Sequence, residues 1–323
     1  MIPAESLFRP AGRVVALCGG VGGAKLARGL ADLLGGRLQI IVNTGDDFEH
    51  LGLSISPDID SVLYALAGLN DKEKGWGRAG ESWSFMQELE RFGEETWFQL
   101  GDRDLAVHVA RTRALQSGQT LSEVTSGFAE RLGIEASVIP MSDDKVRTIV
   151  HVDTSELPFQ HYFVKHQCQP KVCELEFRGA AEARVSPQAL SALHASDLAA
   201  IMVCPSNPYL SIGPMLAIPG IRHALEKTSV PILAVSPLVG GRAVKGPLSK
   251  LMEELSVRQG NEGIVQYYGD LLDGLIIDET DSCMRDQLGL PVMVAQTLMS
   301  NEVDRRTLAA AAIDFAKYLG SEA

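Results

Sequence analysis

A short apolar segment leads directly into a cluster of glycines and then into a helix-forming stretch, and this order constrains the fold more than any other feature. Residues 13–18, RVVALC, are mostly apolar and partly β-branched, as in a buried strand. Glycines stand at positions 19, 20, 22 and 23, and the helical pattern AKLARGLADLL follows. A strand, a tight loop and a helix in this order predict the first unit of a sheet whose parallel strands are connected by helices.

Strand-like and helix-like segments alternate at both ends of the chain but not in its middle. The segment LQIIVN at 38–43 predicts a second buried strand, and LAAIMVC, PILAVS, GLIIDE and VMVAQTL predict four more after residue 186. Between about residues 60 and 148, apolar residues mostly recur at helical spacing. The segments RTIVHVD and FQHYFV then predict a small antiparallel pair of strands.

We therefore expect a Rossmann-like, doubly wound α/β fold with a mainly parallel sheet. Residues 13–60 and 180–323 should form this core, and residues 1–12 a polar leader. Residues 61–179 should form a mainly helical insertion, with a small β element, that covers the ligand-binding edge of the sheet. In open parallel sheets that edge is the one where the strands end.

Composition limits the class of protein. The 323 residues are 46% hydrophobic and 22% charged, which excludes a disordered chain. The formal net charge of −12 argues against a nucleic-acid partner, because phosphate backbones bind to cationic surfaces. Neither a signal peptide nor a membrane span is recognisable, so we expect a cytoplasmic protein without membrane contact. The five scattered cysteines are expected to be reduced thiols: Cys18, Cys168, Cys173, Cys204 and Cys283.

The glycine cluster is the first candidate for ligand binding. Glycines between a strand and a helix let backbone N–H groups approach a phosphate at the helix N-terminus. The spacing departs from the dinucleotide fingerprint, which needs a glycine where Lys25 stands, and from the Walker loop, which needs Gly-Lys-Ser/Thr. A tight turn without a ligand is the alternative. Four glycines ahead of a lysine favour contact with a phosphate or a ribose.

Four carboxylates fall within fifteen residues after the second strand: Asp46, Asp47, Asp58 and Asp60. Clustered carboxylates repel one another unless a cation lies between them, and Mg²⁺ is typically held by one or two carboxylates together with substrate phosphate. Alternatively, Asp58 caps the helix that begins near Asp60, since Ser-Pro-Asp is a common helix start. We expect both capping and catalysis within this group.

The segment Asp102-Arg103-Asp104 is the second charged cluster. Two flanking carboxylates could hold the Arg103 guanidinium rigid for bidentate binding of phosphate. On a helix, Asp104 and His108 share a face, and Arg111 lies three residues further. The alternative is a solvated face of ion pairs, which contributes nothing to a site.

Two later loops each follow a predicted strand. They are Pro205-Ser206-Asn207-Pro208 and the segment 236–242, SPLVGGR, after which comes Lys245. Turn formation alone would explain these residue types almost as well. Their common place at the ligand edge favours contacts with a nucleotide.

Taken in order, these motifs resemble the 2-phospho-L-lactate transferase family. The segments that carry the resemblance are ALCGGVGGAKLARGL, VNTGDD, LSISPDIDSVLYALAG, GWGRAGESW, LGDRDLAVHVART, IPMSDDKVRT, FQHYFV, PSNPYLSIGPMLAIPGIR and SPLVGGRAVKGP. The resemblance implies an enzyme of coenzyme F-420 biosynthesis. It would transfer a 2-phospholactate, phosphoenolpyruvate or 3-phosphoglycerate moiety from a GDP-linked donor to the deazaflavin Fo, releasing GMP and requiring Mg²⁺. A homodimer is also implied.

The resemblance assigns roles to individual residues. It implies contact of Asp60 and Arg103 with Fo, and it implies that Asp46 and Asp47 hold or face Mg²⁺. Arg103 would neutralise charge on the transferred phosphoryl group, and the proton acceptor would be Asp47, Asp58 or Asp60. The remaining residues expected to contact substrate are Gly19, Gly20, Gly22, Gly23, Lys25, Asn43, Thr44, Asp102, His108, Ser206, Asn207, Ser236, Gly240 and Lys245.

A regulatory protein that binds nucleotide sugars, similar to the gluconeogenesis factors, is the alternative from another class. Those proteins share the glycine-rich start and a loop of the Asn-x-Gly-Asp-Asp type. The segments GWGRAGESW and LGDRDLAVHVART favour the transferase.

Overall fold

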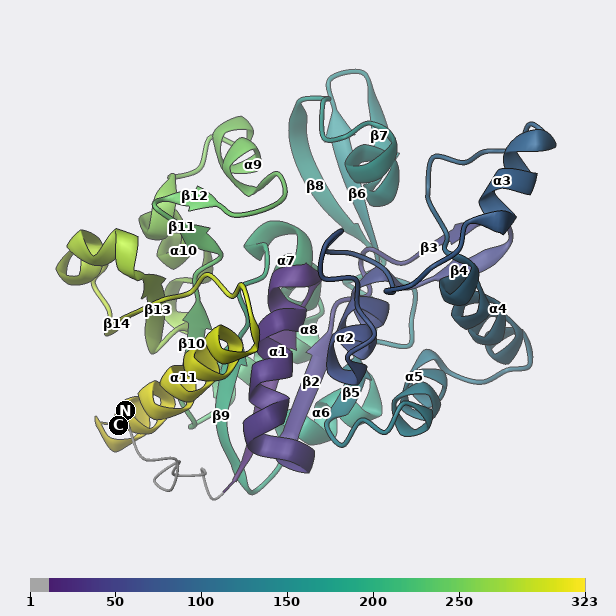
Figure 1. Cartoon of the computed structure of the whole chain (residues 1–323). Coiled ribbons are helices and arrows are strands. Elements are labelled where there is room, and N and C mark those ends of the chain that lie inside the picture. Colours follow the sequence, from purple (N-terminus) through teal and green to yellow (C-terminus); the bar gives the residue numbers. More distant parts are fainter. Residues whose placement is uncertain (1–11, 323) are drawn as a thin grey trace.

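The strand β1 (Arg13–Cys18) lies in the interior of a seven-stranded parallel sheet (Figure 1). This is a computed structural model, and it describes residues 12–322. The strand order is β14-β13-β10-β9-β1-β2-β5, and every neighbouring pair is parallel. The other six strands are β2 (Leu38–Val42), β5 (Ser137–Pro140), β9 (Leu198–Val203), β10 (Ile232–Val235), β13 (Gly274–Asp278) and β14 (Val292–Ala295).

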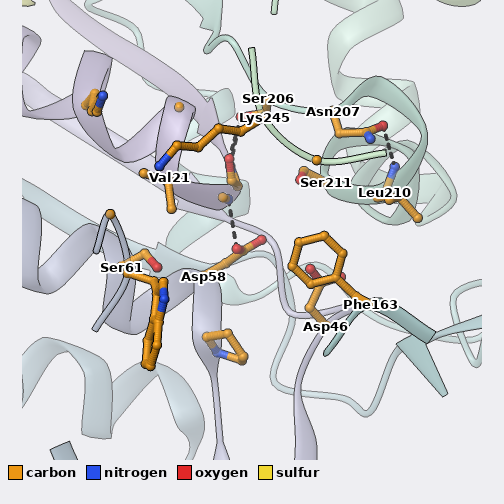
Figure 2. A pocket seen from close by; sticks show the side chains of 18 of the residues that line it. Val21, Asp46, Asp58, Ser61, Phe163, Ser206, Asn207, Leu210, Ser211 and Lys245 are labelled. Carbon is orange, nitrogen blue, oxygen red and sulfur yellow. Dashed lines mark hydrogen bonds between the residues drawn. The ribbon is translucent and has the colours of Figure 1, made fainter. Parts of the chain in front are cut away.

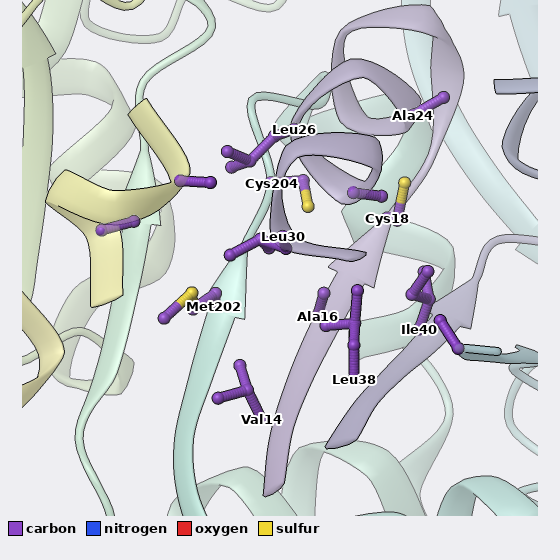
Figure 3. Close-up of a cluster of buried hydrophobic side chains, with 14 of the residues drawn as sticks. Val14, Ala16, Cys18, Ala24, Leu26, Leu30, Leu38, Ile40, Met202 and Cys204 are labelled. Atoms are coloured by element: carbon purple, nitrogen blue, oxygen red, sulfur yellow. The ribbon is translucent and has the colours of Figure 1, made fainter. Parts of the chain in front are cut away.

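Helices cover both faces of the sheet, because successive strand residues point to opposite sides. Along β1, Val14 and Ala16 belong to one hydrophobic core and Val15 and Leu17 to the other. Figure 3 shows the first core, where Leu26 and Leu30 of a helix pack over the sheet. Its helices are α1 (Gly20–Leu34), α2 (Pro57–Ala67), α5 (Leu121–Arg131) and α11 (Glu302–Glu322). The opposite face carries α6 (Pro187–Leu193), α7 (Gly213–Leu216), α8 (Pro219–Lys227), α9 (Leu248–Glu254) and α10 (Gly260–Tyr268).

The order of the strands reverses at β1. The chain first runs outward from β1 to β2 and β5, and it then returns to β9 and runs outward on the other side. The expected doubly wound α/β fold is therefore confirmed. The two loops that diverge at the carboxyl ends of β1 and β9 leave a crevice between them, which is where such sheets bind ligands.

Residues 61–179 differ from the expected insertion in two respects. They supply β5 to the central sheet, a strand of four residues that is too short for its alternation to be recognised. The antiparallel partners of β6 (Arg147–Val152) are β7 (Ser155–Pro158) and β8 (Val172–Arg178), and FQHYFV is not a strand. It contains the π-helix η2 (His161–Lys165) instead. The prediction of a strand at FQHYFV was wrong. Six residues are too few to distinguish the two-residue period of a strand from the period of about 3.6 residues of a helix.

Further elements lie at the carboxyl edge of the sheet (Figure 1). They are the hairpin of β3 (Phe48–His50) and β4 (Leu53–Ile55), and the helices α3 (Ser84–Arg91) and α4 (Asp102–Gln116). Short elements complete the fold: η1 (Gly35–Arg37), η3 (Pro208–Ile212), β11 (Leu238–Val239), β12 (Arg242–Ala243), η4 (Gly269–Leu271) and η5 (Glu279–Gln287). Within residues 12–322, no helix has both the length and the hydropathy to cross a bilayer.

The helices α1 and α11 lie side by side on the sheet, although they come from opposite ends of the chain (Figure 1). They pack tightly at Gly29, where an added Cβ would collide with the backbone carbonyl oxygen of Arg305. Gly29 therefore sets the distance between the two helices, and the ends of the chain form one core.

Gly29→Ala should lower the stability of the protein, although alanine favours a helix over glycine by about 1 kcal/mol. The reason is that the backbone of α11 must move away, which opens the core that Figure 3 shows. Gly127→Ala in α5 is the matched control, because a Cβ there meets only the flexible end of Arg131. Urea denaturation should show opposite changes in the two variants. Equal changes would contradict this role of Gly29.

Candidate functional site

A cavity of about 720 Å³ lies at the carboxyl ends of β1 and β9. One wall consists of the start of α1 and the loops after β9, β10 and β14. The opposite wall consists of the starts of α2 and α4 together with inserted segments around residues 74–77, 97–99 and 159–164. The cavity thus lies in the crevice that the strand order creates.

The loops after β1 and β9 are fastened together by Ser206. Its hydroxyl accepts a hydrogen bond from the Gly19 N–H at 3.1 Å and donates one to the Gly19 carbonyl at 2.7 Å. A Cβ on Gly23 would collide with the same hydroxyl, which explains why the loop needs a glycine there. The glycines therefore serve close packing of two loops, and Gly19, Gly20 and Gly22 also line the cavity.

Asp58 joins three segments at the base of the cavity (Figure 2). Its Oδ1 accepts a hydrogen bond from the Gly20 N–H at 2.7 Å, and its Oδ2 accepts one from Asn43 Nδ2 at 3.0 Å. Burial raises the pKa of Asp58 to about 6, although these two hydrogen bonds act in the opposite direction. Its side chain accepts no bond from its own helix, so the capping alternative does not describe it.

Asp46 and Asp47 follow β2 but face different surroundings. Asp46 lines the cavity, whereas Asp47 accepts a hydrogen bond from Ser56 at 2.8 Å and does not line it. Each keeps one buried oxygen, Oδ1, without a hydrogen-bond donor among residues 12–322. Burial, and then the charge of Asp58, raise the pKa of Asp46 well above its usual range, and burial raises that of Asp47 to about 7.

Asp60 is held by Arg111, a residue that was not predicted to belong to the site. Both carboxylate oxygens of Asp60 accept from Arg111, whose side chain is 1% exposed. Arg111 Nη1 also lies 3.2 Å from His108 Nδ1. On the other side of the ring, His108 Nε2 lies 3.4 Å from Asp104 Oδ2.

Asp60, Asp104 and His108 also offer ligand atoms that lie within 4.8 Å of one another. The Arg111 guanidinium contacts both Asp60 and His108, so a cation here would meet a positive charge. Asp104 in turn accepts a hydrogen bond from the Tyr64 hydroxyl. This network is better suited to fixing α4 against α2 than to binding a metal ion.

Arg103 lies outside the cavity lining, and its contact with substrate stays a prediction. Its side chain is exposed, it does not line the cavity, and neither flanking carboxylate holds it. Asp102 accepts hydrogen bonds from Ser82 and from the N–H groups at the start of α3. The helical face shared by Asp104, His108 and Arg111 was the signal for the arginine that does contact the acidic cluster.

Aromatic side chains form the part of the cavity that the sequence did not indicate. In η2 and the turn before it, Phe159, Gln160, Phe163 and Val164 face the cavity together, as the wide turn of a π-helix allows. Phe163 projects toward Asp46 in Figure 2 and stacks on Phe159 with ring centroids 5.3 Å apart. The other aromatic lining residues are Tyr64, Trp76, Trp97 and Phe98.

The cavity brings together most of the residues predicted for the site. Those that line it are Gly19, Gly20, Gly22, Lys25, Asp46, Asp58, Asp60, His108, Ser206, Asn207, Ser236 and Lys245. Those that do not are Gly23, Asn43, Thr44, Asp47, Asp102, Arg103 and Gly240. Two of these act through residues that do line it: Asn43 donates a hydrogen bond to Asp58, and Gly23 leaves room for the Ser206 hydroxyl.

The family profile described as 2-phospho-L-lactate transferase CofD matches residues 14–314. The chain belongs to the 2-phospho-L-lactate transferase family. It is 40% identical over 277 residues to a phosphoenolpyruvate transferase of Kitasatospora aureofaciens, covering 83% of this chain and 86% of that one. It is also 40% identical over 301 residues to a 2-phospho-L-lactate transferase of Methanopyrus kandleri, covering 92% and 95%.

Membership of this family makes the chain a transferase and favours that class over the regulatory alternative. Among solved structures, a UPF0052 family protein of Bacillus halodurans resembles it with a TM-score of 0.62. That structure is 15% identical, and the match covers 94% of this chain and 99% of the other. At this identity the likeness concerns the fold alone.

Two isosteric substitutions should distinguish an aspartate that is paired with a buried arginine from one that keeps a buried oxygen without a donor. Asp60→Asn leaves the buried charge of Arg111 without its partner and should cost about 3 kcal/mol of unfolding free energy. Asp46→Asn removes a repelling charge and should leave stability unchanged or raised. Chemical denaturation of both variants at pH 8 without metal tests this. A large loss of stability in Asp46→Asn would contradict it.

Without metal, the stability advantage of Asp46→Asn should grow as the pH rises from 5 to 8. An exposed aspartate has a pKa of 3.8, whereas burial and Asp58 raise that of folded Asp46. The folded state therefore keeps a proton that the unfolded chain has released, so stability falls with rising pH in wild type and less in the variant. Melting temperatures of both proteins in EDTA measure this difference. A difference that shrinks with pH would show the opposite sign.

Proposed function

We propose that this transferase moves a phospho-acid group from a GDP-linked donor to a hydroxyl of the deazaflavin Fo, releasing GMP, in coenzyme F-420 biosynthesis. One observation carries the proposal: a single cavity combines an aromatic wall with a glycine loop at a helix N-terminus and a group of carboxylates. The aromatic wall suits a planar ring system, and the glycine loop suits a phosphate. The acid carried by the donor would be phosphoenolpyruvate, 2-phospholactate or 3-phosphoglycerate.

Asp46 fits the position of a ligand for Mg²⁺. Its carboxylate lines the cavity, and one oxygen is buried without a hydrogen-bond donor, as expected for an oxygen that coordinates a cation. The remaining ligands would be phosphate oxygens of the substrate and water. When bound, the cation would neutralise charge on the transferred phosphoryl group and on the departing phosphate.

Asp58 suits the task of taking the proton from the attacking hydroxyl. Its pKa of about 6 lies near neutrality, and each of its oxygens accepts only one hydrogen bond and so keeps a lone pair. Asp60 is less suited, because both of its oxygens bind Arg111. Arg111 and His108 would then act indirectly, by fixing α4 and its cavity residues against α2.

Asp46→Asn and Asp47→Asn should differ in activity although the two residues are adjacent. Asp46 lines the cavity, so its variant should lose about a hundredfold or more in turnover. Asp47 bonds to Ser56 away from the cavity, so its variant should lose much less. Purified protein, Fo, Mg²⁺ and each of the three GDP-linked donors provide the assay, with product and GMP detected by mass spectrometry.

EDTA should abolish product formation in the same assay, and excess Mg²⁺ should restore it. Turnover that persists in EDTA would contradict the metal requirement, and no product with any donor would contradict the transfer itself. We also expect a cytoplasmic homodimer. Light scattering would measure its mass.

A further inference from the structure

Three lysines line the cavity: Lys74 lies over the rings of Trp76 and Trp83, and the other two, Lys25 and Lys245, lie near the start of α1 without a carboxylate partner. Lys25, on the second turn of α1, donates to the Met299 carbonyl at 2.9 Å, and Lys245 extends from the loop after β12. Figure 2 shows the Lys245 ammonium reaching toward Val21, at the start of α1. Neither lysine forms an ion pair with a carboxylate in the described part of the chain, from residue 12 to residue 322. Two cations thus extend from one wall of the cavity, and Lys245 reaches the opposite segment at Gly75.

This wall is suited to a multiply charged anion. Burial, and then the charges of Lys245 and Arg305, lower the pKa of Lys25, so its positive neighbours are close enough to repel it. The start of α1 adds the partial positive charge of a helix N-terminus, although its first N–H, that of Gly20, already donates to Asp58. The repulsion would be relieved by an anion with several oxygens, such as a phosphate or a diphosphate. The chain as a whole carries −12, so this positive wall is a local exception.

Gly75 lies directly against the Lys245 ammonium. A Cβ at Gly75 would collide with Lys245 Nζ and would touch no other residue so closely. The backbone around Gly75 is fixed by Asp71, whose carbonyl accepts from the Gly75 N–H at 3.0 Å and whose Oδ1 accepts from the N–H groups of residues 73 and 74. Since the backbone is fixed and the lysine is flexible, a side chain at Gly75 would displace the ammonium.

We propose that Lys25 and Lys245 bind the phosphate of the nucleotide donor that departs with GMP, and that Gly75 is a positioning residue that leaves room for the Lys245 ammonium. This inference rests on the proposed function and names the groups that hold the leaving phosphate. In Figure 2, Asp58 lies between Lys245 and Phe163. An in-line displacement needs the attacking and leaving oxygens on opposite sides of phosphorus, and Asp58 and the two lysines would serve these two oxygens separately.

Gly75→Ala and Gly77→Ala form a matched pair of variants. Both glycines have positive φ, +74° and +68°, so an alanine meets similar backbone strain at each. A Cβ at Gly77 has nothing within 4 Å, whereas a Cβ at Gly75 meets Lys245. Any difference in binding between the two variants therefore reports the displaced ammonium. Melting temperatures of the two variants should agree.

Calorimetric titration with GDP and Mg²⁺ tests the inference in the full-length protein. Gly75→Ala should weaken GDP binding about tenfold relative to Gly77→Ala, as expected for the loss of one charge-assisted contact. Lys245→Ala should show the same loss. In the Lys245→Ala background, Gly75→Ala should weaken GDP binding no more than Gly77→Ala does. The contact with the Lys245 ammonium is already absent from that background.

Each outcome decides the matter. Equal affinities of Gly75→Ala and Gly77→Ala, or additive losses in the double variant, would overturn the role of Gly75 while leaving the transferase activity intact. If Gly75→Ala does not fold, unchanged GDP affinity of Lys245→Ala would overturn the role of the lysine. If the wild-type protein binds inorganic pyrophosphate but not GDP, the result supports an anion site and contradicts a nucleotide donor. Wild type that binds neither would overturn the inference.

Discussion

The hydrogen bonds of one buried carboxylate, Asp58, hold together the segments that form the cavity. They join the first turn of α1, through Gly20, to the end of β2, through Asn43, and to the start of α2. Gly19 must be a glycine partly for this reason, since a Cβ there would lie 2.8 Å from Asp58 Oδ2. The carboxylate is nevertheless costly to bury, as its pKa of about 6 indicates. Burial of Asp58 therefore lowers the stability of the fold at the residue expected to accept the proton, and such costs are common at functional sites.

The sheet could be predicted from the sequence because each of its longer strands is a continuous apolar run between turn residues. The strand β5 could not, because four residues, Ser137–Pro140, carry too little pattern and lie among helices. The alternation in FQHYFV predicted a strand, whereas tertiary packing forms a π-helix with Phe159 and Tyr162 buried. In short segments, packing against distant elements decides the structure, and local periodicity is a weak guide.

The candidate site followed the same division. Residues that follow the core strands, such as Asp46 and Ser206, could be predicted to converge because parallel strands end at one edge. Arg103 and Arg111 could not be told apart by the motif, since only the packing of α4 against α2 shows which one is buried beside Asp60. The aromatic lining could not be predicted at all, because its residues, apart from Tyr64 of α2, come from three inserted segments whose relative positions no local pattern encodes.

The uneven distribution of charge within the cavity has a consequence for how a ligand enters it. The carboxylates Asp46, Asp58 and Asp60 gather after β2 and at the start of α2, whereas Lys25 and Lys245 extend from the start of α1 and the loop after β12; a third lysine, Lys74, lies on the opposite wall. The electric field therefore points from Lys25 and Lys245 toward the carboxylates. A molecule with an anionic end and a neutral end has a lower energy in one orientation than in the reversed one, so the cavity selects polarity as well as shape.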